Sequence, residues 1–257
     1  MTLPKKEVLA LIPARGGSKS IPRKNLIKIL GKPLIIWTIE LAKKSELINR
    51  IIVSTDDEEI AKVALDNGAE VPFIRPSKYA EDQSTDIDVF RHCLKWLKSN
   101  ENYQPEIIAH LRPTGPARDI NLIDLAIKKI LHNPKAHSLR SISLASQTPF
   151  KMWFLDEDKE FMNPVIKLKD CSESHSLPRQ ILPKAYWQNG YIDIIRSGTI
   201  LNLKSMVGKC SIPFIINHMV HDLDYIEDIP YVEKALKRII DKKNNNEDII
   251  NEDRHPV

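Results

Sequence analysis

The first half of the chain alternates short apolar runs with stretches in which apolar residues recur at helical spacing. The apolar runs predict buried strands at 8–12, 51–55, 71–74, 107–111 and 139–144. The stretches between them predict helices at 33–42, 56–67, 86–97 and 119–132. This alternation indicates an α/β fold with a Rossmann-like, mostly parallel sheet and helices on both faces.

The region 147–189 breaks this order, because its apolar pattern is irregular and prolines interrupt it. The Gln188-Asn189-Gly190 sequence between 185–187 and 191–195 predicts a β-hairpin. An excursion of this size is uncommon without a role such as a partner contact or a lid, so we expect a protruding arm at about 147–190. Regular structure resumes with a strand at 212–216 and a helix at 226–240. The polar tail, 241–257, is expected to be disordered.

Composition indicates an ordinary globular protein of 257 residues, with 42% hydrophobic and 28% charged residues. We expect residues 1–240 to form one domain with the arm inserted. The net charge of +4 is modest and no aromatic residues interleave with basic ones, so no nucleic-acid partner is expected. Three distant cysteines favour a reducing, cytoplasmic setting. No apolar run approaches the roughly 20 residues of a membrane span, and the N-terminal run is a first strand rather than a signal peptide.

The most informative stretch is 9–25, and its part after the first predicted strand, residues 14–25, is called the basic loop below. Its adjacent glycines, Gly16 and Gly17, let the backbone turn and direct N–H groups into one concavity. It also carries four cations, Arg15, Lys19, Arg23 and Lys24. This composition suits nucleotide phosphates, although neither G-x-G-x-x-G nor G-x-x-x-x-G-K-[ST] is present. The alternative is a solvated loop that binds nothing, and a position at the carboxyl end of a strand argues against it.

A second cluster, His218-Met-Val-His221-Asp222-Leu223-Asp224, follows the strand at 212–216. Asp222 and Asp224 are two positions apart, so an extended backbone directs both carboxylates to the same side. Paired carboxylates together with phosphates form the kind of site that Mg²⁺ prefers. Alternatively, Asp222 caps the following helix and Asp224 is solvated. A zinc site at His218 and His221 has weak support, because no second pair of ligands is present.

Two further rigid, polar loops also follow predicted strands. The loop at 111–118 contains Arg112, whose guanidinium could bind a carboxylate or hydroxyl groups. The loop at 75–82 begins with Arg75 and Pro76. Each loop alone is better explained as a structural turn. Because the carboxyl ends of parallel strands share one edge of a sheet, all four loops are expected to form one site.

These motifs, in this order, resemble the acylneuraminate cytidylyltransferases, or CMP-sialic acid synthetases. The resemblance covers about residues 7–240 and rests on IPARGGSKSIPRKN, RPSKYAED, LRPTGPAR, TPFK, PRQILPKAYWQNG and HDLD. It implies a fold of the nucleotide-diphospho-sugar transferase type. It also implies that the anomeric 2-hydroxyl of a nine-carbon 2-keto sugar acid attacks the α-phosphorus of CTP, with release of pyrophosphate. Mg²⁺ or Mn²⁺ as cofactor, and a homodimer held by the arm, are further implications.

The resemblance implies a role for each matching residue. The nucleotide would be bound, through its triphosphate, ribose or base, by Arg15, Ser18, Lys19, Asn25, Arg75 and Ala80. The implied catalytic set, in which the two aspartates hold the metal, is Arg15, Lys24, Asp222 and Asp224. The sugar would contact Arg112 and Lys151, and Arg179, from the arm of the neighbouring subunit, would meet the sugar carboxylate.

Two positions depart from the family pattern: Arg112, where relatives often carry Gln, and Gly115, where many carry Ser. Both lie on the sugar side, so the choice among sialic, legionaminic and related acids stays open. One rival hypothesis is another sugar nucleotidyltransferase, such as a CMP-octulosonate synthetase, and the PRQILP arm with Asp222 and Asp224 argues against it. The other is a non-catalytic nucleotide-binding protein, which would need no metal-held α-phosphate and no Lys24.

Overall fold

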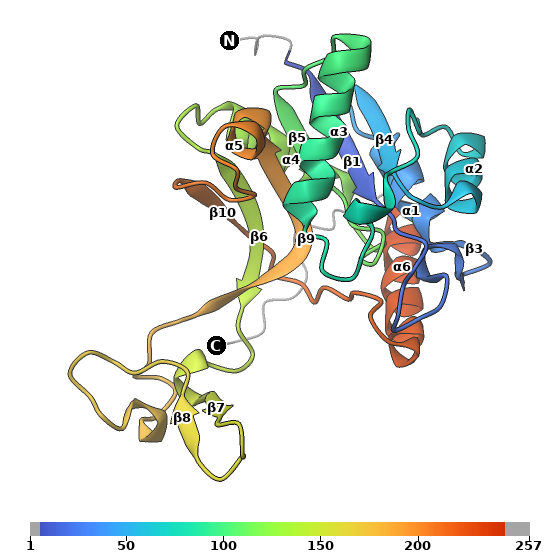
Figure 1. Cartoon of the computed structure of the whole chain (residues 1–257). Coiled ribbons are helices and arrows are strands. Elements are labelled where there is room, and N and C mark those ends of the chain that lie inside the picture. The colour runs from blue at the N-terminus through green and yellow to red at the C-terminus, as the bar shows by residue number, and fades with distance from the viewer. Residues whose placement is uncertain (1–5, 245–257) are drawn as a thin grey trace.

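A six-stranded sheet forms the centre of the protein in a computed structural model that describes residues 6–244 (Figure 1). The strand order is β10-β6-β9-β5-β1-β4. The strands are β1 (Val8–Pro13), β4 (Arg50–Ser54), β5 (Ile107–His110), β6 (Ser138–Leu144), β9 (Tyr186–Arg196) and β10 (Ser211–Ile215). β9 runs antiparallel to its neighbours β5 and β6, whereas the other neighbouring pairs are parallel. The predicted fold class is confirmed.

Helices cover both faces of this sheet (Figure 1). One face packs against α1 (Leu34–Ala42), α2 (Glu58–Asp66) and α4 (Ile120–Leu131). The other packs against α3 (Asp86–Glu101) and α5 (Ser197–Leu201). A third apolar cluster joins the basic loop to α6 (Ile229–Asn244). The short elements are the ribbon β2 (Lys28–Ile29) with β3 (Lys32–Pro33), and the 3₁₀ helices η1 (Lys24–Leu26), η2 (Ser77–Tyr79), η3 (Pro149–Lys151), η4 (Ser174–Ser176) and η5 (Ile226–Asp228).

Alternation of side chains along β1 explains the two-sided core. Ala10 and Ile12 join the cluster under α1, α2 and α4, whereas Leu9 and Leu11 join the cluster under α3. A strand buried on both faces is a continuous apolar run, which is the pattern that identifies β1 in the sequence. Full burial of a side chain such as leucine stabilises a fold by about 1.5–3 kcal/mol. This packing fixes the carboxyl end of β1, where the basic loop begins.

The predicted strand at 71–74 is wrong. Within this segment only Ile74 pairs, in an isolated bridge with Thr55, and Glu70, just before it, bridges to Ile52. Pro72 in its middle has no N–H to donate to a strand ladder, so regular pairing cannot form there. The segment still follows β4, and the loop after it starts at the expected edge of the sheet.

The predicted hairpin at 185–195 is also wrong, because residues 186–196 form one continuous strand, β9. Gly190 adopts a positive φ of 66°, but it lies where the pairing with β6 shifts register. Such an irregularity bends a strand without reversing it. The Asn189-Gly190 signal therefore marks a bend in β9 instead of a turn.

Residues 145–185 leave the sheet between β6 and β9 and are called the arm below (Figure 1). A hydrogen bond from the N–H of Ala145 to the carbonyl of Ala185, 2.9 Å long, closes its base. Within the arm, β7 (Trp153–Leu155) pairs antiparallel with β8 (Met162–Pro164). The arm exposes several large apolar side chains, including Phe154, Leu155, Phe161, Met162 and Ile181.

Helix ends follow the predicted signals at the caps. Asp57 and Asp119 accept backbone N–H groups at the starts of α2 and α4. α3 extends to Glu101, beyond the predicted end, and closes on Asn102 with a left-handed φ of 51°. α6 continues to Asn244, so residues 241–244 of the predicted tail are helical, and 245–257 lie outside the described residues. Among residues 6–244, no helix is both long enough and apolar enough to cross a membrane.

Candidate functional site

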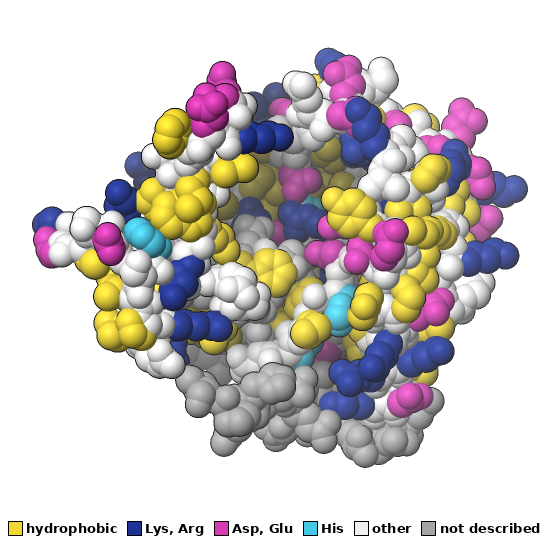
Figure 2. Space-filling view, turned by 90° about the horizontal axis from the view of Figure 1, so that it is seen from below, with side chains coloured by type: hydrophobic (Ala, Val, Ile, Leu, Met, Phe, Trp, Pro, Cys, Tyr) yellow, Lys and Arg dark blue, Asp and Glu magenta, His cyan; other side chains and the backbone are white. Residues whose placement is uncertain are grey.

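The carboxyl ends of β1 and β5 open into a cleft of about 520 Å³. It is lined by the basic loop, by residues of the segment 75–89 and by 112–114, together with Asp224. Figure 2, seen from below Figure 1, shows a hollow in this face where basic and acidic side chains gather. The predicted site residues that line the cleft are Arg15, Ser18, Lys19, Lys24, Asn25, Arg75, Ala80, Arg112 and Asp224. The loops therefore converge at one edge of the sheet.

Gly16 brings the basic loop against the start of α2. A Cβ atom at this position would lie 2.6 Å from Oδ2 of Asp57 and 2.9 Å from its Cβ, so only glycine fits. The N–H of Gly16 donates to Oδ1 of Asp56 at 3.1 Å, and the same oxygen accepts from Nη2 of Arg75 at 3.3 Å. Asp56 therefore joins the basic loop to the loop at 75–82. Gly17, by contrast, faces open space.

The cations of the basic loop already have acidic partners. Nη1 of Arg15 lies 3.2 Å from Oδ1 of Asp82, and Lys19 pairs with the other oxygen of the same carboxylate. The hydrogen bond from Lys19 and the nearby positive charges lower the pKa of Asp82. Arg23 pairs with Asp57 at 2.8 Å. An anion that enters the cleft must compete with Asp82 for Arg15 and Lys19.

Lys24 is the most enclosed cation of this loop, with 10% of its side chain exposed. Its Nζ lies 3.2 Å from Oδ1 of Asp224. Ile21 of the basic loop and Leu223, next to Asp224, are buried in one apolar cluster that α6 completes. This cluster holds the basic loop and the 222–224 segment together.

Asp222 and Asp224 flank the buried Leu223, and only Asp224 lines the cleft. Burial raises the pKa of Asp222, and the charge of Arg118 opposes this effect while that of Asp224 reinforces it. The hydroxyl of Thr114 donates to Oδ1 of Asp222 at 3.5 Å. The two carboxylates are thus close enough to repel each other, which a divalent cation would relieve.

The donor set fits Mg²⁺ or Mn²⁺, whose sites commonly combine one or two carboxylates with water and substrate phosphates. Within residues 6–244, no group of three or more His, Cys, Asp or Glu side chains is placed to hold a metal by itself. His218 and His221, the weak zinc candidates, contact the rings of Tyr191 and Tyr231. A Cβ atom at Gly115 would lie 2.7 Å from Oδ1 of Asp222. Only glycine at this position therefore lets the Asp222 carboxylate stay where it is.

Arg75, Ala80 and Asn25 line the same cleft. Arg75 is buried, and burial lowers its pKa in spite of its hydrogen bond to Asp56. Asn25 is also buried and stabilises the basic loop by donating to the carbonyl of Arg15 at 3.0 Å. These contacts hold the polar groups of this wall in fixed positions.

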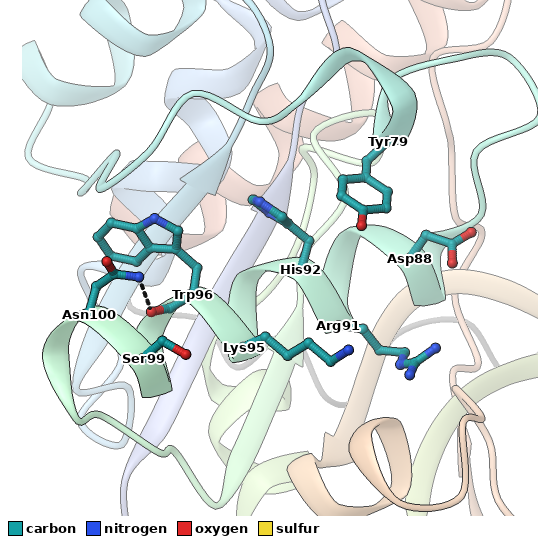
Figure 3. A pocket seen from close by; sticks show the side chains of 8 residues that line it. All are labelled: Tyr79, Asp88, Arg91, His92, Lys95, Trp96, Ser99 and Asn100. Carbon is teal, nitrogen blue, oxygen red and sulfur yellow. Dashed lines mark hydrogen bonds between the residues drawn. The ribbon is translucent and has the colours of Figure 1, made fainter.

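A second depression, of about 300 Å³, lies on α3 beside the loop at 75–82 (Figure 3). Its lining comprises Tyr79, Asp88, Arg91, His92, Lys95, Trp96, Ser99 and Asn100. Tyr79 lines both the depression and the cleft. Its ring lies 5.1 Å from that of His92, which lies 4.8 Å from that of Phe73. These edge-on and tilted ring contacts, called the aromatic cluster below, anchor the loop at 75–82 to α3.

Arg112 is held between two acids that the sequence analysis did not select. Its Nη1 donates to Asp193 at 2.8 Å, and its Nη2 donates to Asp86 at 3.0 Å. Burial lowers the pKa of Arg112, but the charges of Asp193 and Asp86 outweigh it and raise the pKa overall. Asp193 interrupts the apolar run of 191–195, and a single acid in a buried strand is the signal that could have identified it.

Lys151 and Arg179 lie apart from the cleft. Lys151 ends η3 and is exposed, and Nη2 of Arg179 donates to the carbonyl of Ala145 at the base of the arm, at 3.2 Å. Neither residue lines the cleft of its own chain. The single chain therefore does not bring these two predicted sugar residues together with Arg112.

Known proteins are similar in sequence to this chain. The profile of the family described as Cytidylyltransferase matches residues 9–197. Pseudaminic acid cytidylyltransferase of Campylobacter jejuni is 32% identical over 231 residues, which is 89% of this chain and 96% of that protein. CMP-N,N'-diacetyllegionaminic acid synthase of Legionella pneumophila is 31% identical over 221 residues, which is 84% of this chain and 90% of that protein.

A solved structure shares the fold. The structure of CMP:2-keto-3-deoxy-manno-octonic acid synthetase complexed with CTP matches with a TM-score of 0.65 at 15% identity, covering 90% of this chain and 99% of that one. The likeness supports a fold of the nucleotidyltransferase type. The family profile spans most of the chain, and the relatives align over nearly their whole length, so the resemblance drawn from the motifs is confirmed. The chain belongs to the cytidylyltransferase family of nucleotidyltransferases.

Proposed function

We propose that the protein transfers CMP from CTP to the anomeric 2-hydroxyl of a nonulosonic acid and releases pyrophosphate. The observation that carries this proposal is the enclosed Lys24, which lies 3.2 Å from Asp224 in the cleft that the basic loop lines. The acceptor class is supported by the two relatives, which are named for pseudaminic acid and for N,N'-diacetyllegionaminic acid.

The basic loop would hold the triphosphate through Arg15, Ser18 and Lys19, once phosphate oxygens replace Asp82 on the two cations. Lys24 would lie against the α-phosphate, where negative charge develops. There the 2-hydroxyl oxygen of the sugar forms a bond to the α-phosphorus. The bond between the α-phosphorus and the oxygen that bridges to the β-phosphate breaks, and the electron pair of that bond leaves with pyrophosphate. The hydroxyl proton passes to solvent. Because Lys24 is nearly enclosed, its charge acts in a low-dielectric setting, where such stabilisation is strongest.

The ribose and cytosine would lie against Asn25, Arg75 and Ala80. All three line the cleft, and Asp56 together with the aromatic cluster of Tyr79 supports this wall from behind. Fixed polar groups recognise a base with little ordering cost, which suits a site that selects one nucleotide.

Asp222 and Asp224 would hold Mg²⁺ or Mn²⁺ beside the triphosphate. When bound, such an ion polarises the α-phosphoryl group and neutralises charge on the leaving pyrophosphate. The chain prepares this position in two ways: Thr114 hydrogen-bonds Asp222, and the buried Leu223 fixes the spacing of the two carboxylates.

The sugar would lie toward Arg112, and Lys151 and Arg179 would reach it from a neighbouring subunit of a homodimer. The exposed apolar side chains of the arm support such an assembly, because surfaces of this kind mark protein contacts. Residues 1–240 would act as one domain. The thiols of Cys93, Cys171 and Cys210 are free, which supports a reducing, cytoplasmic setting.

Pyrophosphate release tests this function. Reactions would contain Mg²⁺, one nucleotide and one sugar acid from a panel of pseudaminic, N,N'-diacetyllegionaminic, N-acetylneuraminic and 3-deoxy-manno-octulosonic acids. We expect release with CTP and a nonulosonic acid, and little with ATP, GTP or UTP. Turnover with the octulosonic acid alone would establish the rival transferase. Calorimetric binding of CTP without turnover across the panel would favour a non-catalytic nucleotide-binding protein.

A further inference from the structure

Three strands place a row of polar side chains beside the cleft. His110 of β5 pairs in register with Asp193 of β9, and Asp193 pairs in register with Arg140 of β6. Residues directly opposite each other on neighbouring strands lie on the same face of a sheet. Arg112 follows two positions after His110, so the alternation of side chains returns it to that face. The strand pairing itself therefore assembles this row.

Asp193 lies at the centre of the row and is fully buried. Its Oδ2 accepts from Nη1 of Arg112 at 2.8 Å and from Nη1 of Arg140 at 2.9 Å. Arg140 is fixed in turn, because its Nη2 donates to the carbonyl of Met206 at 2.8 Å. A buried carboxylate between two guanidinium groups cannot turn away without leaving charges unpaired. Asp193 therefore holds the Nη1 edge of Arg112 in place.

The Nη2 edge of Arg112 has a different partner. It donates to Oδ2 of Asp86, the first residue of α3, at 3.0 Å. The side chain of Asp86 is 43% exposed and lines the cleft, so a ligand can reach this ion pair. Exposed ion pairs contribute little net stability, and one such partner can replace another.

The charge balance of the row favours replacement of the Asp86 carboxylate by another anion. Arg112 and Arg140 are balanced by Asp86 and Asp193. His110 adds no charge, because burial and the neighbouring guanidinium groups hold its pKa well below the ordinary value. If Asp86 leaves without a substitute, one positive charge remains in excess beside the cleft, and a ligand carboxylate restores neutrality.

We propose that Asp86 is an exchangeable counter-ion and a specificity-determining residue. The carboxylate of the sugar acid, which Arg179 of the partner subunit would share, replaces Asp86 on the Nη2 edge of Arg112. Asp193 acts as the positioning residue for the Nη1 edge. This inference rests on the proposed function, in which a sugar acid lies at Arg112. A neutral sugar has no carboxylate to exchange, so Asp86 stays on Arg112 and the site favours acids.

Steady-state kinetics of the full chain with Asp86→Asn test the exchange. Removal of the competing charge should lower the KM for the sugar acid roughly two- to fivefold and leave the KM for CTP unchanged. This range corresponds to the free energy that an exposed ion pair contributes. Asp88→Asn is the matched control. It removes the same charge from the first turn of α3 but outside the cleft, and both KM values should stay at their wild-type levels.

Asp193→Asn tests the positioning role separately. The KM for the sugar acid should rise at least about tenfold while the KM for CTP stays near wild type, since a close hydrogen-bonded charge pair of Arg112 is lost. The melting temperature should fall as well, because Arg140 loses the same buried counter-ion, so the kinetics are measured well below it. A parallel loss of CTP affinity would make Asp193 a structural residue instead.

The outcomes separate the exchange from the function on which it rests. Normal wild-type turnover with an unchanged or higher sugar-acid KM in Asp86→Asn overturns the exchange and leaves the proposed function standing. A lower KM for CTP in that variant would assign Arg112 to the triphosphate and also overturn it. Absence of wild-type turnover with every nonulosonic acid refutes the proposed function, and the exchange with it.

Discussion

The ammonium group of Lys24 lies 3.2 Å from the carboxylate of Asp224, although 200 residues separate them in the sequence. Ile21 and Leu223, each close in sequence to one member of the pair, are buried in the same apolar cluster. Hydrophobic packing therefore creates the proximity, and the ion pair is its consequence. The cation of the basic loop and the acid of the 222–224 segment meet because their neighbours share a core.

Asp224→Asn tests the acid pair. We expect kcat to fall at least about a hundredfold, because the metal that neutralises developing charge is held less tightly. The melting temperature should change little, since the side chain of Asp224 is 64% exposed. Kinetics at increasing Mg²⁺ concentrations are the measurement, and Asp241→Asn on α6 is a control for lost negative charge. A near-normal rate would remove the metal assignment.

Gly16→Ala and Gly17→Ala form a matched pair. The Cβ atom that Gly16→Ala adds would force Asp57 away from its capping position, which costs about 1 kcal/mol of stability, and would displace the Asp56 link to Arg75. We expect CTP affinity to fall at least about tenfold, a loss of about 1.4 kcal/mol or more. Gly17 faces open space, so its variant should stay within about 0.5 kcal/mol of wild type. Thermal unfolding and calorimetry with CTP measure both; equal effects in the two variants would contradict the steric argument.

Phe161→Glu tests the role of the arm. Phe161 is 69% exposed in the single chain, and a charge there should prevent burial against a second subunit. We expect a dimer for wild type and a monomer for the variant in sedimentation experiments. The variant should keep its CTP affinity and lose turnover, since Lys151 and Arg179 no longer reach the sugar. Leu125→Glu, at an exposed position of α4, is the control. A monomeric, active wild type would contradict the assembly.

His110 predicts how stability depends on pH. Burial, reinforced by the charges of Arg112, Arg140 and Arg118, holds its pKa well below 6.5, although Nδ1 lies 3.9 Å from Asp193 and 4.0 Å from Asp86. Above about pH 6.5 this residue does not affect the pH dependence. Below this pH the histidine binds a proton in the unfolded chain but not in the folded protein. The free energy of unfolding therefore falls by up to about 1.4 kcal/mol per pH unit.

Urea unfolding at about pH 7 and about pH 5.5 measures this effect. His110→Phe should reduce the loss of stability between the two conditions, because the variant cannot bind the proton in either state. His132→Phe, which replaces an exposed histidine at the end of α4, should leave the loss unchanged. An equal loss in wild type and His110→Phe would mean that other groups dominate the acid response.

Local chemistry made most of the elements and loops predictable. β1 is buried on both faces and is therefore a plain apolar run, and Asp57 and Asp119 are local cap signals. The segment at 71–74 has the same apolar character, but Pro72 prevents regular pairing. The bend at Gly190 depends on how β9 pairs with β6, which no short stretch of sequence specifies.

The same distinction applies to the site. A cation is recognisable from its own motif, as Arg15 and Lys19 are in the basic loop. Their partner Asp82 is an ordinary exposed acid in the sequence, and it gains meaning only when the loops converge. The same holds for Asp86, whereas Asp193 does carry a local signal, because it is a single acid in a buried apolar strand. Charge balance is a property of the assembled site.

The arm begins at the end of β6 and returns at the start of β9, and the hydrogen bond between Ala145 and Ala185 ties its two ends. Those strands pair with each other in the sheet, so the ends meet whatever lies between them. Lengthening or exchanging such an excursion adds little closure entropy. The part of the chain that carries Lys151 and Arg179 can therefore diverge as a unit. Under the proposed function, acceptor preference and subunit pairing would then change together while the residues proposed to bind cytidine stay as they are.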